Sequence, residues 1–308
     1  MKTRKGIILS VIAAALWGFT PVATKIALEG FSPEFLGFVR LALAALLFRP
    51  LGGPKARWFV ADPWIWLAGV GLGADFLLYN YGVRLTSANV SGLVINIELI
   101  STIVLAVWIL GERLDGRRAL GGAITLAGVL IVTLDGLRWT DLTESSRTVG
   151  NILVMLAGIA WSFYAVAQRR AQFRGNIFQL LTPIFTVAAI TTAPVLIRKD
   201  AWIVTGGFLP TAMFIVLTVL GTNAVYWIYA RAQELMDVSV ISIVLCTIPV
   251  FTVAFAYAFL GERLTLQLFV GGAIIVAGIL QCTERRSIKS LTSIESPNKE
   301  RLADSSRI

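Results

Sequence analysis

The chain has 308 residues, of which 56% are hydrophobic and 15% are charged, and its mean hydropathy is +0.78. These values lie outside the usual range of soluble domains, and they predict an all-α integral membrane protein. The formal net charge is +9. Basic residues of a membrane protein anchor its topology and attract anionic lipids, so we expect a lipid bilayer as partner and no nucleic acid.

The residue types also argue against an enzyme. The chain contains no His, which is the commonest general base and metal ligand, and its two cysteines, Cys246 and Cys282, are isolated in apolar runs. We therefore expect no metal, no cofactor and no catalytic residue. A membrane-embedded lipid-modifying enzyme, using Ser, Lys or Asp, and a passive channel stay as alternative classes.

Ten apolar runs of about 17 to 25 residues are long enough to cross a bilayer as helices. They are residues 7–28, 34–51, 64–83, 88–110, 118–137, 149–169, 177–197, 210–231, 238–260 and 266–283. The first run follows basic residues, as a signal peptide does. It continues through Pro21 and Lys25 rather than into a small-residue cleavage site, so we expect an uncleaved first helix.

The first two helices carry residues that suggest coupling or gating. Lys25 and, in the second helix, Arg40 are charged groups inside apolar sequence. The alternative is that both lie near helix ends and extend to the head groups. Pro21 in the first helix, like Pro183 in the seventh and Pro249 in the ninth, removes a backbone hydrogen bond and marks a candidate hinge.

The third and fourth helices each place polar residues on one face. Asp75 and Tyr79 are four residues apart in the third helix, and Asn89 and Asn96 are seven apart in the fourth. Hydrogen bonding between helices explains single Asn residues, but it explains less well why amides and aromatic residues gather in the same helices. We expect these side chains to line a cavity that binds substrate.

Two acids lie inside apolar helices, Asp75 in the third and Glu98 deep in the fourth. A charge at the centre of a membrane helix costs about 2.5–3.5 kcal/mol, so both are predicted to face a cavity and to take part in substrate binding or coupling. For Asp75 the alternative is a structural ion pair with Arg40 or Lys25. For Glu98 it is a protonated acid that is hydrogen-bonded to a neighbouring helix.

The sixth and eighth helices complete the expected binding set. They contribute Trp161, Tyr164, Gln168, Asn223 and Tyr226. Trp17 lies eight residues before Lys25 and Trp161 lies eight before Arg169, so the two tryptophans occupy matching places. We expect their rings to face one shared cavity at the membrane midplane, the alternative being the aromatic belt at the membrane surface.

The chain contains a long internal repeat. Leu110-Gly-Glu-Arg-Leu114 recurs as Leu260-Gly-Glu-Arg-Leu264, and Gly121-Gly-Ala-Ile124 recurs as Gly271-Gly-Ala-Ile274. This predicts two copies of one unit, residues 1–137 and 138–283, and a disordered cytoplasmic tail at 284–308. Because each copy holds five helices, the second must lie inverted relative to the first, which is typical of secondary transporters. The small residues after each motif indicate close helix packing or a dimer face.

The orientation follows from the basic residues. With the N-terminus in the cytoplasm, nineteen Lys and Arg fall on the inner side and six in the outer loops. The excess of positive charge marks the cytoplasmic side, so both termini are predicted to be cytoplasmic.

These motifs resemble a known family. The residues that carry the resemblance are Trp17-Gly18 followed by Lys25, Arg40, Ser87-Ala88 and the two Leu-Gly-Glu-Arg-Leu blocks with their continuations. Together, over residues 6 to 283, they resemble the EamA repeats of the drug/metabolite transporter superfamily, and within it the amino-acid exporters of the YddG type. The resemblance implies ten helices around a central cavity in a bacterial inner membrane. One departure leaves the kink of the fourth helix open: the family often has Pro there, and the second copy has Pro249, but the first reads Ile97-Glu98-Leu99.

An amphipathic lining with few fixed charges suits a small solute with one polar and one apolar end. Hydrophobic, aromatic and other neutral amino acids fit, with the carboxylate on Arg, Lys or helix amides and the ammonium over a Trp ring or beside Glu98. We expect alternating access without an energy source, in a monomer or homodimer. The alternatives are proton-coupled efflux of cationic compounds and transport of sugar phosphates or nucleotide sugars. The phosphate of such sugars would need stronger binding by Arg or Lys side chains.

Overall fold

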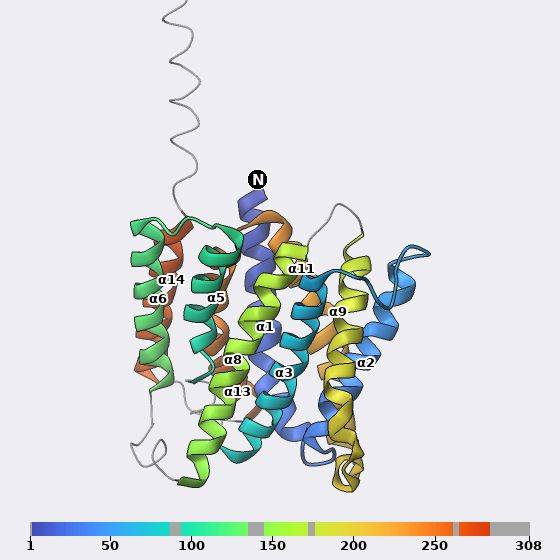
Figure 1. The fold of residues 1–308 in the computed structure, drawn as a ribbon. Helices are drawn as coiled ribbons and strands as arrows, with labels where there is room; N and C mark the ends of the chain where they lie inside the picture. Colours follow the sequence, from blue (N-terminus) through green and yellow to red (C-terminus); the bar gives the residue numbers. More distant parts are fainter. Residues whose placement is uncertain (1, 87–93, 135–144, 172–175, 261–264, 284–308) are drawn as a thin grey trace, which may run out of the picture.

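The computed structural model describes residues 2–86, 94–134, 145–171, 176–260 and 265–283 (Figure 1). Helices make up nearly all of this part of the chain. They are α1 (Lys2–Ala27), α2 (Pro33–Leu51), α3 (Pro63–Leu85), α5 (Ile97–Leu110), α6 (Gly116–Thr133), α8 (Ser145–Ala171), α9 (Ile177–Thr192), the 3-10 helices η1 (Ala193–Ile197) and η2 (Lys199–Trp202), α10 (Phe208–Thr218), the π-helix η3 (Val219–Ala224), α11 (Val225–Leu235), α12 (Val238–Leu245), α13 (Ile248–Leu260) and α14 (Leu266–Thr283).

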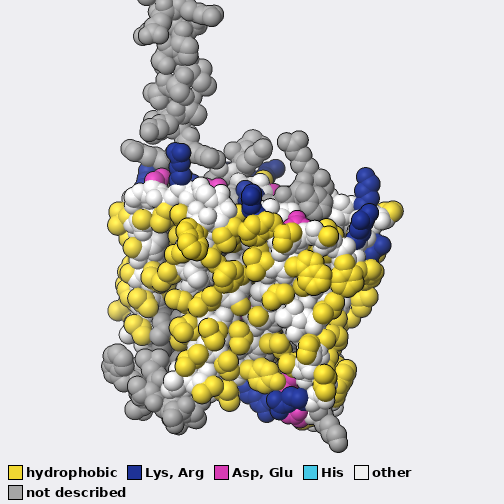
Figure 2. Space-filling view, viewed as in Figure 1, with side chains coloured by type: hydrophobic (Ala, Val, Ile, Leu, Met, Phe, Trp, Pro, Cys, Tyr) yellow, Lys and Arg dark blue, Asp and Glu magenta, His cyan; other side chains and the backbone are white. Residues whose placement is uncertain are grey.

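The outer surface is that of a protein embedded in a membrane. Five helical segments of the described chain are long and apolar enough to cross a bilayer: Thr3–Ala27, Thr148–Ala171, Ile177–Ile197, Phe208–Gln233 and Val238–Phe255. Figure 2 shows hydrophobic side chains over the middle of the visible face and Lys and Arg gathered at its two ends. The molecule is therefore a multi-pass helical membrane protein.

The helices form one bundle (Figure 1). A closely packed pair of helices lies at each of two opposite sides of it. α6 lies beside α14 at one end, and α2 lies beside α9 at the other. Between them, α8 packs on α3 and α5, while α1 packs on α10, α11 and α13. Pro21 in α1 and Pro183 in α9 lie inside continuous helices. The central position of α1 and α8 brings their aromatic residues together.

The ninth helix is broken in the middle, and a similar turn comes immediately before α5. The chain turns at Ile95 and Asn96 before α5 begins, and it turns again at Cys246 and Thr247 between α12 and α13. Asn96 (φ −64°, ψ −6°) and Cys246 (φ −62°, ψ −5°) have nearly the same backbone geometry. The turn before α5 therefore forms without proline, and residues 87–93 of the predicted fourth helix lie outside the described residues. Pro249 is the second residue of α13, where its missing N–H costs little.

Helix α8 accounts for the break that lacks proline. A Cβ atom on Gly158 would lie 2.9 Å from the carbonyl oxygen of Ile95, so only glycine lets α8 approach the turn this closely. The Ser162 hydroxyl donates to the Glu98 carbonyl at 3.1 Å, and the Ser101 hydroxyl donates to the Ile97 carbonyl at 2.9 Å. In the turn itself, the backbone N–H groups of Glu98 and Leu99 donate to the Ile95 and Asn96 carbonyls at 3.0 and 3.1 Å, so these backbone groups have partners, as the interior of a membrane requires.

The eighth helix departs from the regular helix predicted for residues 210–231. It runs from Phe208 to Leu235 and contains the π-helical turn Val219–Ala224 between α10 and α11. A π-helical turn rearranges the backbone hydrogen bonds, and such turns are frequent at functional sites. The turn faces Arg40 of α2.

Glycines set the distance between α6 and α14. A Cβ on Gly121 would lie 2.7 Å from the carbonyl oxygen of Gly278, and one on Gly128 would lie 2.7 Å from that of Gly271. The small residues therefore pack the two helices within one molecule, which confirms close packing as their role.

Candidate functional site

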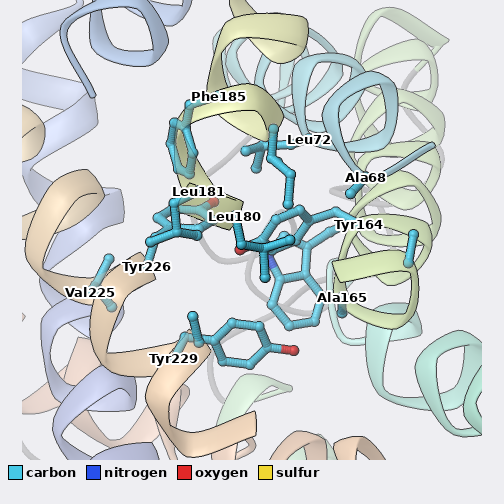
Figure 3. Packing of buried hydrophobic residues seen from close by; sticks show 14 of the residues in the cluster. Ala68, Leu72, Tyr164, Ala165, Leu180, Leu181, Phe185, Val225, Tyr226 and Tyr229 are labelled. Carbon is cyan, nitrogen blue, oxygen red and sulfur yellow. The ribbon is translucent and has the colours of Figure 1, made fainter. Parts of the chain in front are cut away.

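Five aromatic side chains meet where α1, α8 and α11 come together. They are Trp17, Trp161, Tyr164, Tyr226 and Tyr229. The ring centroids of Trp17 and Trp161 are 5.9 Å apart, and those of Trp17 and Tyr226 are 5.4 Å apart. Figure 3 shows Tyr164, Tyr226 and Tyr229 converging from α8 and α11. We call these five residues the aromatic cluster.

The aromatic cluster is closed in this conformation. Its rings touch one another, mostly in edge-on and tilted geometries, so the two tryptophans do not face each other across an open cavity as expected. A cavity of about 240 Å³ lies to one side, lined by apolar residues of α1, α10, η3 and α13. A solute at the cluster would have to separate its rings.

Sequence reasoning missed Tyr229. This residue is fully buried and its ring lies 5.5 Å from Trp17 and 5.4 Å from Trp161. Its position three residues after Tyr226 on the same helix could have identified it.

A buried amide pair adjoins the aromatic cluster. The Gln168 side-chain Nε2 donates to the Gln233 side-chain Oε1 at 2.9 Å, and the Gln233 Nε2 donates to the Tyr229 hydroxyl at 3.0 Å and to the Ala165 backbone carbonyl at 2.9 Å. Both glutamines are fully buried. Gln168 was predicted to bind substrate, and here it ties α8 to α11.

Arg40 is buried in the middle of α2, with 4% of its surface exposed. Its Nε and Nη2 atoms donate to the Thr222 hydroxyl at 3.1 and 3.0 Å, and Nη2 donates to the Gly221 carbonyl at 3.4 Å. The guanidinium lies 4.8 Å from the centre of the Phe76 ring. Arg40 therefore does not extend to the head groups, because the π-helical turn of η3 supplies oxygens that hold it inside the bundle.

Two acids share this polar region. Asp75 is buried, and it lies within electrostatic range of both Arg40 and Glu98. Among the described residues, no ion pair within 4 Å joins Asp75 to Arg40 or Lys25. The direct structural ion pair considered for Asp75 is thus absent here. Glu98, the second residue of α5, is half-buried at a helix N-terminus, where the helix dipole favours an anion.

Of the other predicted residues, Tyr79 and Asn223 lie inside the bundle, whereas Lys25 and Asn89 are not part of the described site. Tyr79 is half-buried on α3, within electrostatic range of Asp75 and Arg40. Asn223 lies in η3, and both polar atoms of its side chain are buried without a hydrogen-bond partner. Lys25, by contrast, is exposed in the last turn of α1, and Asn89 lies outside the described residues.

The site offers binding rather than bond-making chemistry. It combines aromatic rings, amides, one buried cation and two acids. In the described part of the chain, no group of three His, Cys, Asp or Glu side chains could hold a metal ion. Such a set can bind a small solute reversibly by stacking, hydrogen bonds and charge.

The fold and this site define a membrane transporter built from helices, some of them broken near the middle. Residues 4–134 and 148–282 each match the EamA-like transporter family, and the chain belongs to that family. It is a transporter, not an enzyme.

Known proteins support the same class. The chain is 27% identical over 305 residues to a "Probable terminal-alkyne amino-acid exporter" of Streptantibioticus cattleyicolor. The aligned region covers 92% of this chain and 95% of that protein. It is 26% identical over 298 residues to an "Uncharacterized inner membrane transporter" of Escherichia coli, covering 89% and 90%. One crystal structure shares the fold with a TM-score of 0.76 at 19% identity, covering 90% of this chain and 96% of the other.

Proposed function

We propose that the protein exports neutral amino acids, chiefly hydrophobic and aromatic ones, by facilitated alternating access. The observation that carries this proposal is the aromatic cluster beside a buried cation and two acids. Rings suit the apolar side chain of such a solute, and the charges suit its polar end. The name of the Streptantibioticus relative points to the same class of solute.

We propose the following topology. The described helices belong to ten membrane spans, in two inverted units of residues 1–137 and 138–283, with a cytoplasmic tail at 284–308. The fourth span includes α5, the eighth is α10, η3 and α11, and the ninth is α12 with α13. Both termini lie in the cytoplasm and the protein resides in a bacterial inner membrane. The packing of α8 on α5 and of α1 on α13 is what a two-fold relation between the units requires.

Helix breaks support a route for alternating access. Helices broken near the bilayer midplane are where transporters bind their solute, and their two halves can tilt separately. The breaks at residues 95–96 and 246–247 are the natural hinges, with Pro21 in α1 as a further one. Opening the aromatic cluster then requires α1 and α8 to part.

Uptake into proteoliposomes tests the proposal. Labelled phenylalanine, methionine and threonine are offered with and without a pH gradient, beside the variants Trp17→Ala and Trp161→Ala. We expect saturable uptake that stops at equilibration and ignores the pH gradient. Each Trp variant should lose most of this uptake, because it removes a ring from the cluster. Trp108→Ala is the matched control, since Trp108 is 85% exposed on α5.

Two results would redirect the proposal. No flux of any amino acid would remove this solute class and leave cationic drugs or phosphorylated sugars. Accumulation driven by the pH gradient would keep the class but replace the facilitated mode by proton antiport. The half-buried Glu98 at the break would then be the first residue to test, and Glu98→Gln should abolish the driven flux while sparing exchange at equal pH.

A further inference from the structure

We propose that Arg40 and Asp75 together bind the zwitterionic head group of the solute, Arg40 taking the carboxylate and Asp75 the ammonium. This inference rests on the proposed function and makes it more specific. It assigns the solute class as α-amino acids with both charges present, and it excludes plain amines and plain carboxylic acids as good substrates.

The surroundings of Arg40 are those of a cation that lacks a contacting anion. It is 4% exposed, and within the described chain its hydrogen-bond partners are neutral oxygens, the Thr222 hydroxyl and the Gly221 carbonyl. Burying a charge is costly unless it is paired, and neutral oxygens compensate only in part. A carboxylate at this place would supply the opposite charge.

Asp75 is placed to take the other end of the same molecule. It is 9% exposed on α3, the same helix that places the Phe76 ring 4.8 Å from the Arg40 guanidinium, so the acid and the cation belong to the contact between α3 and α2. They interact electrostatically, but no ion pair within 4 Å joins them among the described residues. Two opposite charges that are near but not in contact match a zwitterion that bridges them.

Asn223 adds an unused donor and acceptor. Its amide nitrogen and oxygen are both buried without a hydrogen-bond partner, whereas buried side-chain polar atoms nearly always have one. Asn223 follows Thr222, the residue that holds Arg40. An amide on the π-helical turn that contacts this cation can donate to a carboxylate and accept from an ammonium, so the turn offers bonds to both ends of the head group.

The aromatic cluster continues from this polar end. Tyr226 lies one turn after Asn223, and its ring is 6.3 Å from Phe76, 5.4 Å from Trp17 and 5.5 Å from Tyr164. Along this line the site changes from charged to aromatic. The head group would bind at Arg40 and Asp75, and the side chain would insert among the rings.

Competition in proteoliposomes tests this assignment. Uptake of labelled phenylalanine is measured against unlabelled phenylalanine, phenylalaninamide, which lacks the carboxylate, and 3-phenylpropionate, which lacks the ammonium. In the wild type we expect phenylalanine to compete about tenfold better or more than either analogue, as one lost charge-assisted hydrogen bond predicts. In Arg40→Gln the preference over phenylalaninamide should disappear, and in Asp75→Asn the preference over 3-phenylpropionate should disappear.

Arg49→Gln is the control, because Arg49 lies on the same helix but bonds the Gly53 carbonyl and stacks near Trp58. It should keep both preferences. If Arg40→Gln does not fold, as its melting curve would show, Asn223→Leu provides a second test, in which both preferences should fall because the amide serves both ends of the head group. Unchanged preferences with equally reduced rates would assign Arg40 and Asp75 a structural role and overturn the inference alone. A wild type that carries no amino acid would overturn the proposed function as well.

Discussion

Gln233 connects α8 and α11 in the interior of the protein, although the sequence did not mark it as an important residue. Its amide group contacts α8 through Gln168 and Ala165 and contacts Tyr229 on its own helix. All three contacts are buried, so no water replaces them when the side chain is lost. At the scale of single residues, this amide supports the position of a ring that the proposed solute would touch.

We predict that Gln233→Leu lowers stability by about 1–3 kcal/mol, because it leaves the Gln168 amide buried without its acceptor and removes the bond to the Ala165 carbonyl. The melting temperature of the purified protein in detergent measures this. Gln267→Leu, at an exposed position of α14, is the matched control and should melt as the wild type does. Equal melting of Gln233→Leu and the control would contradict the role assigned to the pair.

The sequence predicted single residues that a repeated pattern marks, but it did not predict contacts between residues far apart in the chain. Trp17 and Trp161 were predicted together from their matching places in the two copies, and their rings are in contact. Arg40 was recognised as an unusual charge, but its partner Thr222 was not foreseen. A partner 182 positions away in a π-helical turn leaves no local pattern, because the contact exists only once α2 and η3 pack.

At the scale of elements, the first Leu-Gly-Glu-Arg-Leu block, residues 110–114, connects the two repeats. Gly111 ends α5 in the left-handed conformation, with φ +67°, which glycine adopts without strain. The Glu112 carboxylate then accepts from the backbone N–H groups of Val238 at 2.7 Å and Ser239 at 3.0 Å. It thereby caps the N-terminus of α12, a helix of the other unit.

We predict that Glu112→Gln costs about 0.5–2 kcal/mol, since an amide has one acceptor oxygen where the carboxylate has two and loses the favourable charge at the helix N-terminus. Thermal melting of the purified protein checks this. Glu234→Gln removes a carboxylate from an exposed pair with Arg231 and should change the melting temperature little. A loss no larger than that of Glu234→Gln would show that the cap does not stabilise α12.

At the scale of the whole molecule, α6 and α14 close one end of the bundle across a glycine contact. Their backbones approach so closely that a Cβ on Gly128 would also lie 2.8 Å from the backbone nitrogen of Ile275. The neighbouring Gly122 has more room, its nearest atom being the Ile243 side chain at 3.7 Å.

We therefore predict that Gly128→Ala destabilises the protein by about 1–3 kcal/mol through overpacking, while Gly122→Ala is neutral or stabilising. The two changes add the same methyl group on the same helix, so the difference between their melting temperatures isolates the contact with α14. Similar melting of the two variants would mean that α6 and α14 can separate without loss.

The sequence by itself determined that this is a helical membrane protein and where most helices lie, since hydropathy is a property of each segment alone. It also determined the internal repeat, and with it the pairing of Trp17 with Trp161. Only the tertiary structure decided that the chain turns before α5 without proline, because this turn packs against Gly158 and Ser162 of α8. It also decided that Arg40 points inward and that the aromatic rings close on one another. These features depend on neighbours distant in the chain, and bilayer physics specifies only that buried polar groups find partners.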